Sequence, residues 1–387
     1  MTKKPTNMLD PTGRAAQCMA SAVPAWRDVV RAEEALGLTQ YELLHAGPPL
    51  ASPQDHCAPI LNAACAALLF EGLARSAEQA RQMILAGEVT LTPAQDRGVV
   101  TPLAAVVSSS MWLHRVIDVD HPSTVAYAPL NEGGGPAQRF GVLTPTVIER
   151  LAWVHKTLGP ALHALGTLDI GLCDLAHRSL AMGDELHARV GVGSALMAEQ
   201  LSARGLAGDA QAFLDSNTQS FLNPWMAACK AMMIAAAKTR GGDLLVAAGG
   251  NGVTFGIQRC VSYGHWVSQP AETPQGPALS TETATIPRLP AIGDSAVIDA
   301  VGLGALALDA APEQAALLDK ERVARMRAAE ALLVVYHPGL ERLIGLDAAR
   351  VTRQLCPGVC LAALDRTGQY GLVARGLAYH PLALYEA

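Results

Sequence analysis

Residues 217–238 read NTQSFLNPWMAACKAMMIAAAK, and this stretch decides the class of fold that we expect. Its small and apolar residues predict a helix from Pro224 to Lys238, because proline is favoured in the first turn of a helix. Asn223 precedes the proline and is expected to cap that helix. The segment is either an ordinary capped helix or one whose free N–H groups bind a carboxylate or phosphate.

Outward from this helix, a helical period extends back to Pro145 and includes an expected helix over Glu185–Leu201. Both flanks alternate strand-like and helical patterns, beginning with an expected helix over Ala25–Gly37. We therefore predict a multidomain α+β fold, in which mixed α/β parts flank a mainly helical middle domain. The expected divisions are a disordered tail (1–14), an N-terminal α/β domain (15–144), a helical domain (145–240) and a C-terminal α/β domain (241–387).

The composition excludes several classes of protein. Charged residues make up 17% of the 387 residues, the formal net charge is −6, and apolar residues reach 50%. Nucleic-acid binding needs clustered Lys and Arg, which an acidic chain without a basic block lacks. Disorder over the whole length is excluded by the apolar content. So little charge also predicts a homo-oligomer that buries apolar surface.

Compartment and metal content are predicted from three further features. The first residues carry two lysines without an apolar run behind them, so no signal peptide is expected. The sequence contains no run of 18 apolar residues, so no membrane helix is expected. The eight cysteines are scattered, and no second close pair accompanies Cys356 and Cys360 to complete a zinc site. We expect a cytoplasmic protein with free thiols, we identify no metal ligands, and the sequence leaves a requirement for a divalent metal open.

The segment 182–189, Met-Gly-Asp-Glu-Leu-His-Ala-Arg, is dense in charge for such an apolar chain. On a helix, Asp184 and His187 would lie three residues apart, and Glu185 and Arg189 four apart. The functional interpretation is a substrate-holding cluster with His187 as a proton carrier. The alternative is an ion-paired amphipathic helix.

Four glycine-flanked polar segments are further candidates. Leu130-Asn131-Glu132-Gly133-Gly134-Gly135 exposes backbone N–H groups that suit an anion, or forms a flexible turn. Gly249-Gly250-Asn251-Gly252 follows an apolar run and is a hairpin turn or a ligand-facing loop. Asp294, in Gly293-Asp294-Ser295, is a site residue or only a helix cap. The fourth is the glycine-spaced polar loop over 365–376.

Together these clusters resemble a family of bacterial proteins, formerly of unknown function, that is linked to the large subunit of oxamate carbamoyltransferase. The matching segments run through nearly the whole chain in order. They are Leu44-His45-Ala46-Gly47-Pro48-Pro49, Leu130-Asn131-Glu132-Gly133, Met182-Gly183-Asp184-Glu185 with His187 and Arg189, Met226-Ala227-Ala228-Cys229-Lys230-Ala231-Met232, Asn251-Gly252 with Phe255-Gly256-Ile257, and Gly293-Asp294-Ser295-Ala296.

The resemblance implies a cytoplasmic carbamoyltransferase of nitrogen metabolism, in allantoin degradation. Its substrates would be a small ureido or amide acid of the oxalurate or oxamate type, with phosphate and carbamoyl phosphate. It also implies other subunits as partners. On this basis we expect Glu132, Asp184, Glu185 and His187 to be catalytic. We expect substrate to be bound by His45, Arg97, Asn131, Gly133, Arg189, Asn223, Asn251, Gly252, Asp294 and Ser295.

Two departures from the family pattern leave the reaction open. Asp96-Arg97 and Asp365-Arg366 stand where the family has histidines. A stand-alone amide or ureido C–N hydrolase or lyase is therefore the second hypothesis, and a non-catalytic subunit of a multi-subunit transferase is the third. A carbamoyltransferase working towards carbamoyl phosphate needs phosphate, and a hydrolase does not.

Overall fold

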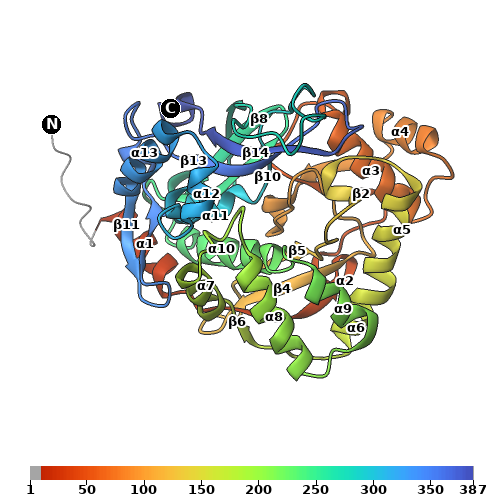
Figure 1. The fold of residues 1–387 in the computed structure, drawn as a ribbon, viewed down its shortest axis with the longest axis horizontal. Coiled ribbons are helices and arrows are strands. Elements are labelled where there is room, and N and C mark those ends of the chain that lie inside the picture. The colour runs from red at the N-terminus through yellow and green to blue at the C-terminus, as the bar shows by residue number, and fades with distance from the viewer. Residues whose placement is uncertain (1–9, 387) are drawn as a thin grey trace.

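The computed structural model describes residues 10–386, which form an α+β fold built around one buried helix, α10 (Leu222–Ala237) (Figure 1). Fourteen of the 16 residues of α10 are buried, because the helix is apolar on all sides. It contacts strands of two separate four-stranded sheets and the helices α1 (Pro11–Ser21) and α11 (Ala296–Val301). The expected helix over Pro224–Lys238 is confirmed, with its start two residues earlier.

Both four-stranded sheets are antiparallel. The first has the order β5-β4-β1-β6 and the second the order β10-β7-β8-β9. Their strands are β1 (Pro24–Arg31), β4 (Trp112–Asp118), β5 (Val125–Pro129) and β6 (Ile170–Gly171), then β7 (Leu245–Asn251), β8 (Thr254–Arg259), β9 (Val267–Pro270) and β10 (Ile292–Gly293).

Three two-stranded sheets complete the strand pairings described. A parallel pair joins β2 (Glu42–His45) to β3 (Thr90–Pro93), and antiparallel pairs join β11 (Leu333–His337) to β12 (Arg342–Leu346) and β13 (Gly358–Leu364) to β14 (Leu372–Tyr379). The remaining helices are α2 (Ala32–Leu36), α3 (Ala58–Phe70), α4 (Ala77–Leu85), α5 (Pro145–Trp153), α6 (Gly159–His163), α7 (Leu172–Ala181), α8 (Gly191–Ala203), α9 (Gly208–Ser216), α12 (Pro312–Ala316) and α13 (Lys320–Ala329).

Two local predictions are wrong. Most of the helix expected over Ala25–Gly37 is strand β1, whose backbone pairs with both β4 and β6, and Trp26 and Val29 are fully buried against them. The helix expected over Glu185–Leu201 begins only at Gly191. Residues 182–190 form a loop, in which Leu186 has a positive φ of 74°.

The predicted organisation is reproduced in part. The α+β class is confirmed, but a mainly helical middle domain is not, because β6 lies within 145–240 and α10 packs on strands from both flanks. The domain boundaries stay a prediction. Pro11–Arg14 belong to α1 and not to a disordered tail, and residues 1–9 lie outside the described residues.

The Asp294 carboxylate joins segments that are far apart in sequence. Its Oδ1 accepts hydrogen bonds from Gly47 N (2.9 Å) and Gln95 Nε2 (2.7 Å), and its Oδ2 accepts from Thr101 N (3.0 Å) and Thr101 Oγ1 (3.1 Å). Lys230, on α10, donates to Gln95 Oε1 at 3.2 Å. We call these five residues the Asp294 network. Burial raises the pKa of Asp294 to about 6 and lowers that of Lys230 to about 8.

Gly47 is required in this network by its surroundings. Its φ is 78°, and a Cβ built on it would lie 2.4 Å from the carbonyl carbon of Gly250. Any other residue would therefore push β7 away from the turn after β2.

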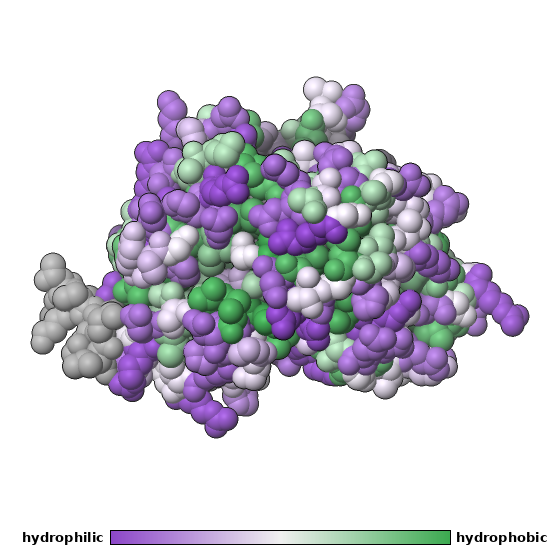
Figure 2. All heavy atoms as spheres, turned by 90° about the horizontal axis from the view of Figure 1, so that it is seen from below, coloured by the Kyte–Doolittle hydropathy of each residue, from purple (hydrophilic) through white to green (hydrophobic). Residues whose placement is uncertain are grey.

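One face of the molecule carries hydrophobic residues near its middle, bordered by hydrophilic ones (Figure 2). The described residues include no helix that is long and apolar enough to cross a membrane. Homo-oligomer formation and the cytoplasmic location stay predictions.

Replacing Asp294 by Asn should lower the free energy of unfolding by about 2 kcal/mol, because an amide N–H₂ would face N–H donors that now have an acceptor. The measurement is the urea midpoint near pH 7. The matched control is Asp120→Asn, since Asp120 is exposed on a turn. Equal midpoints for the two variants would contradict the role given to Asp294.

Candidate functional site

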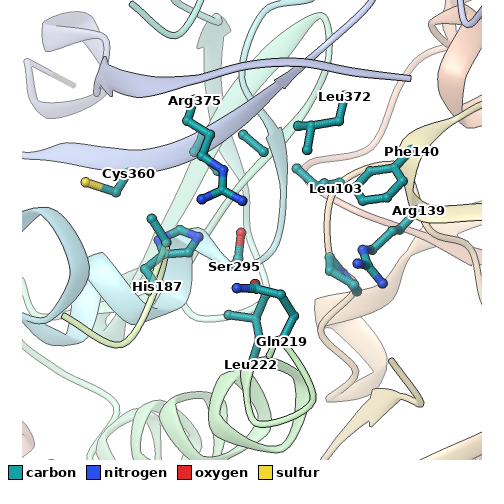
Figure 3. A pocket seen from close by; sticks show the side chains of 14 residues that line it. Leu103, Arg139, Phe140, His187, Gln219, Leu222, Ser295, Cys360, Leu372 and Arg375 are labelled. Atoms are coloured by element: carbon teal, nitrogen blue, oxygen red, sulfur yellow. The ribbon is translucent and has the colours of Figure 1, made fainter. Parts of the chain in front are cut away.

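The candidate site is a small cavity of about 90 Å³, which we call the inner cavity (Figure 3). It lies where the segment before α10, the loop 182–190, the start of α11 and the strands β13 and β14 converge. Its polar lining residues are Arg139, His187, Gln219, Ser295 and Arg375. The other lining residues are Pro102, Leu103, Phe140, Ala188, Leu222, Cys360, Leu361, Ala362 and Leu372.

His187 is held by Asp299. Its Nδ1 lies 2.6 Å from Asp299 Oδ2, and both side chains are buried. Asp299 Oδ1 accepts from Ala305 N (2.7 Å) and Cys360 N (3.2 Å), so the carboxylate is fixed from three sides. Within residues 10–386, His187 Nε2 has no hydrogen-bond partner, although the ring lines the cavity.

The charge state of His187 follows from this pairing. Burial alone would lower the pKa of the imidazole, but the carboxylates of Asp299 and Glu185 outweigh burial and raise the pKa above its usual value. The ring therefore stays protonated to a higher pH than an ordinary histidine does, and its Nε2–H can donate a proton into the cavity.

Two guanidinium groups reach this cavity. Arg375, on β14, points into the space between His187, Ser295 and Gln219 (Figure 3). Arg139 is buried, donates to Asn131 Oδ1 (3.1 Å) and Gly133 O (2.7 Å), and lies over the Phe140 ring. No carboxylate side chain lines the cavity, so its charge suits a small anion.

Asn131, Glu132, Gly133 and Asn223 lie together behind Arg139 and do not line the inner cavity. The Glu132 carboxylate accepts from Gln138 N (2.7 Å) and Arg139 N (3.2 Å), and burial raises its pKa. Asn223 is not a helix cap: it lies within α10, and its side chain donates to Pro129 O. These predicted catalytic and binding residues position Arg139.

Asp184, Glu185 and Arg189 do not enter the cavity either. Asp184 accepts from Val192 N and Gly193 N at the start of α8, and Glu185 accepts from Ala188 N and Arg189 N. These bonds replace the helical hydrogen bonds that the sequence predicted. The Arg189 side chain is exposed and pairs with Glu313 at 2.6 Å. Of this segment, His187 and Ala188 line the cavity.

Four other predicted binding residues lie outside the inner cavity. His45 is buried, its Nδ1 lies 2.8 Å from Ala46 O, and burial beside His56 lowers its pKa to about 4. Asn251 and Gly252 form the hairpin turn between β7 and β8, in which Asn251 Oδ1 accepts from Val253 N and Thr254 N. Arg97 pairs with Glu42 at 2.8 Å.

Ser295 is the predicted binding residue that reaches the inner cavity, and Asp294, just before it, is the centre of the Asp294 network. The two departures from the family pattern lie elsewhere. Asp96 Oδ1 accepts from Gln258 (3.0 Å) and Trp266 (2.9 Å). Asp365 accepts backbone N–H groups of its own loop, from Thr367, Gln369 and Tyr370.

The sequence analysis missed Arg139, Gln219, Asp299 and Arg375. Asp299 had a recognisable sign, since it is one of two acids inside the apolar run Val297–Ala311. Arg375 lies within the segment 365–376, which we expected to be a loop but which is strand β14 from Leu372 onwards, and nothing in the sequence of that segment distinguishes Arg375 from Arg366. No group of three His, Cys, Asp or Glu side chains that could hold a metal occurs between residues 10 and 386.

The fold is shared with a solved structure, that of a conserved protein of unknown function from Enterococcus faecalis. The TM-score is 0.89 at 25% identity, and the match covers 97% of this chain and 95% of that one. The chain matches the family described as oxamate carbamoyltransferase subunit AllG over residues 89–295, more than half of its length.

Two curated relatives from Escherichia coli extend the match. Oxamate carbamoyltransferase subunit AllG is 33% identical over 94% of this chain and 93% of its own length. The uncharacterized protein YahG is 29% identical over 90% of this chain and 78% of its own. The chain therefore belongs to the AllG family and is a carbamoyltransferase-related protein, so the resemblance predicted from its motifs is confirmed.

Replacing Asp184 by Ala should lower the free energy of unfolding by about 1 kcal/mol, because two N–H groups at the start of α8 lose their acceptor. The urea midpoint measures this. An unchanged midpoint in the variant would show that the Asp184 carboxylate does not stabilise the start of α8, which would contradict the structural role given to it.

Proposed function

We propose that this chain is the substrate-binding and catalytic subunit of a carbamoyltransferase that acts on a small ureido acid. Oxalurate and phosphate would be converted to oxamate and carbamoyl phosphate, in a complex with other subunits. The observation that carries the proposal is the buried His187–Asp299 pair facing a cavity with two arginines and no carboxylate. Family membership supports the reaction class.

Arg375 binds the carboxylate of the ureido acid in this proposal. It is the cavity's exposed guanidinium, and within the described residues its side chain has no hydrogen-bond partner. A guanidinium donates two parallel hydrogen bonds to a carboxylate, which orients the substrate as well as binding it. The apolar side chains of Leu103, Leu222 and Leu361 enclose the planar ureido group.

His187 acts as the general acid. When a phosphate oxygen attacks the ureido carbonyl carbon, the C–N bond breaks and its electron pair goes to the nitrogen of the departing oxamate. That nitrogen needs a proton, and the Nε2–H of the protonated imidazole supplies it. Asp299 is a positioning residue that holds the ring and favours its protonated form.

The experiment that tests this function is turnover by the reconstituted complex with oxalurate. Carbamoyl phosphate should form only when phosphate is present, and His187→Ala in this chain should reduce turnover at least a hundredfold under conditions in which the urea midpoint shows the variant to be folded. Ammonia release without phosphate would establish a hydrolase instead. Full turnover with the His187→Ala subunit would leave this chain as a non-catalytic subunit.

The pH dependence of the reaction follows from His187. Turnover requires the protonated ring, so kcat/KM is expected to be constant below the raised pKa and to fall as pH rises through it. Asp299→Asn removes the carboxylate that raises the pKa, so the alkaline limb should move to lower pH. The pH profiles of both proteins measure this. An alkaline limb at the same pH in the Asp299→Asn variant would exclude His187 as the acid.

Replacing Arg375 by Ala should weaken oxamate binding at least tenfold, because the substrate carboxylate loses its charged donor. The matched control is Arg189→Ala, since Arg189 is outside the cavity and pairs with exposed Glu313. Calorimetric titration of oxamate into each protein measures both affinities. Equal oxamate affinities of the two variants would show that the substrate carboxylate does not bind at Arg375.

A further inference from the structure

A second cavity adjoins the inner one, and we call it the outer cavity. Its volume is about 540 Å³, and it shares Arg139, Phe140, Gln219, Leu372 and Arg375 with the inner cavity. The two cavities are therefore adjacent, and we call the place where Arg375 and Gln219 line both of them the junction. The segments that line the outer cavity alone are 134–137, 216–218 and 369–371, together with Val142, Thr144 and Val147.

Each of the three wall segments is anchored by a buried or half-buried side chain. Glu132 and Asn131 hold the first, since they accept from the backbone N–H groups of Gln138, Arg139 and Gly133. The second is tied to the first, because Asn217 Nδ2 donates to Asn131 Oδ1 at 3.1 Å.

The third wall segment is held by Asp365, whose Oδ2 accepts from Gln369 N (2.7 Å) and Tyr370 N (3.0 Å). These hydrogen bonds hold the pKa of Asp365 below its usual value against the effect of burial, so it stays ionised near neutral pH. The outer cavity is therefore bordered by three segments that hydrogen bonds hold in place at or beside their ends, as in a preformed binding site.

The chemistry of the outer cavity differs from that of the inner one. No acidic side chain among the described residues lines it, and its polar lining includes the hydroxyl groups of Thr144, Thr218 and Tyr370. Gly134 and Gly135 are exposed, and neither donates its N–H to an acceptor within residues 10–386. Hydroxyl groups, free backbone N–H groups and arginines are the donors that bind a phosphoryl group.

We infer that the outer cavity is the phosphate subsite and that it is filled together with the inner cavity. This inference rests on the proposed function. Phosphate, with many acceptor oxygens, fits the donor-rich outer cavity, and the flat ureido acid fits the more apolar inner one. Arg375 and Gln219 at the junction contact both ligands. The carbamoyl group passes directly from the ureido acid to the phosphate.

The transfer step balances without a further reactant. An oxygen of hydrogen phosphate attacks the ureido carbonyl carbon at the junction, a C–O bond forms, and the C–N bond breaks. His187 gives its proton to the departing nitrogen and is reprotonated by the proton that the phosphate loses. Carbamoyl phosphate is left in the outer cavity and oxamate in the inner cavity.

Thr218 provides the test, because it is exposed and lines only the outer cavity. Thr218→Trp fills the outer cavity and Thr218→Glu places a negative charge in it. Both variants should weaken binding of inorganic phosphate at least tenfold and leave oxamate binding unchanged. Thr281→Trp, at an exposed position on the loop before β10, is the matched control. Calorimetric titration of the full chain in its complex measures both ligands.

Initial velocities give the second measurement. With oxalurate and phosphate varied together, double-reciprocal lines should intersect, because both substrates bind before any product leaves. Parallel lines would show that the two substrates do not occupy the two cavities at the same time. Unchanged phosphate binding in both Thr218 variants would show that the phosphate subsite is not in the outer cavity. The titration measures binding without turnover, so it separates the two proposals. If no carbamoyl phosphate forms but both Thr218 variants lose phosphate binding, the proposed reaction is refuted and the anion subsite stands.

Discussion

Burial of the Asp294 carboxylate is the constraint on which the rest of the structure depends. A buried carboxylate needs hydrogen-bond donors, and here they come from the turn after β2, from Gln95 and from Thr101. Gln95 in turn accepts from Lys230 in the middle of α10. One side chain therefore fixes how α10, the second sheet and the N-terminal segments meet.

The side chains that line the inner cavity are connected to Asp294 through a few neighbouring residues. Asp294 is followed directly by Ser295, which lines the inner cavity, and by α11, which carries Asp299. Asp299 then orients His187 from a loop that is far away in sequence. Three acids that do not touch the cavity hold backbone segments. Glu185 and Glu132 hold segments that contribute Ala188 and Arg139 to the cavity, and Asp184 caps the start of α8.

The sequence was most informative where local rules dominate. The helix around Pro224, the loop after Leu130 and the turn at Gly252 could be predicted, because proline and glycine restrict or permit particular backbone conformations. The sequence was least informative where the structure depends on contacts between residues that are far apart in the chain. Nothing local marks Pro24–Arg31 as a strand between β4 and β6, and nothing local pairs His187 with Asp299. The dense charged segment 182–189 contributes His187 and Ala188 to the cavity lining, whereas its acids accept hydrogen bonds from backbone N–H groups.

The central claim is that His187 is a protonated donor in a cavity that binds the ureido acid. The most direct measurement is an NMR titration of the His187 ring, assigned with a His187→Gln variant, with and without oxamate. The account predicts a pKa above the ordinary value for histidine and a shift of the ring signals when oxamate binds. A ring that titrates below the ordinary value and does not respond to oxamate would contradict it.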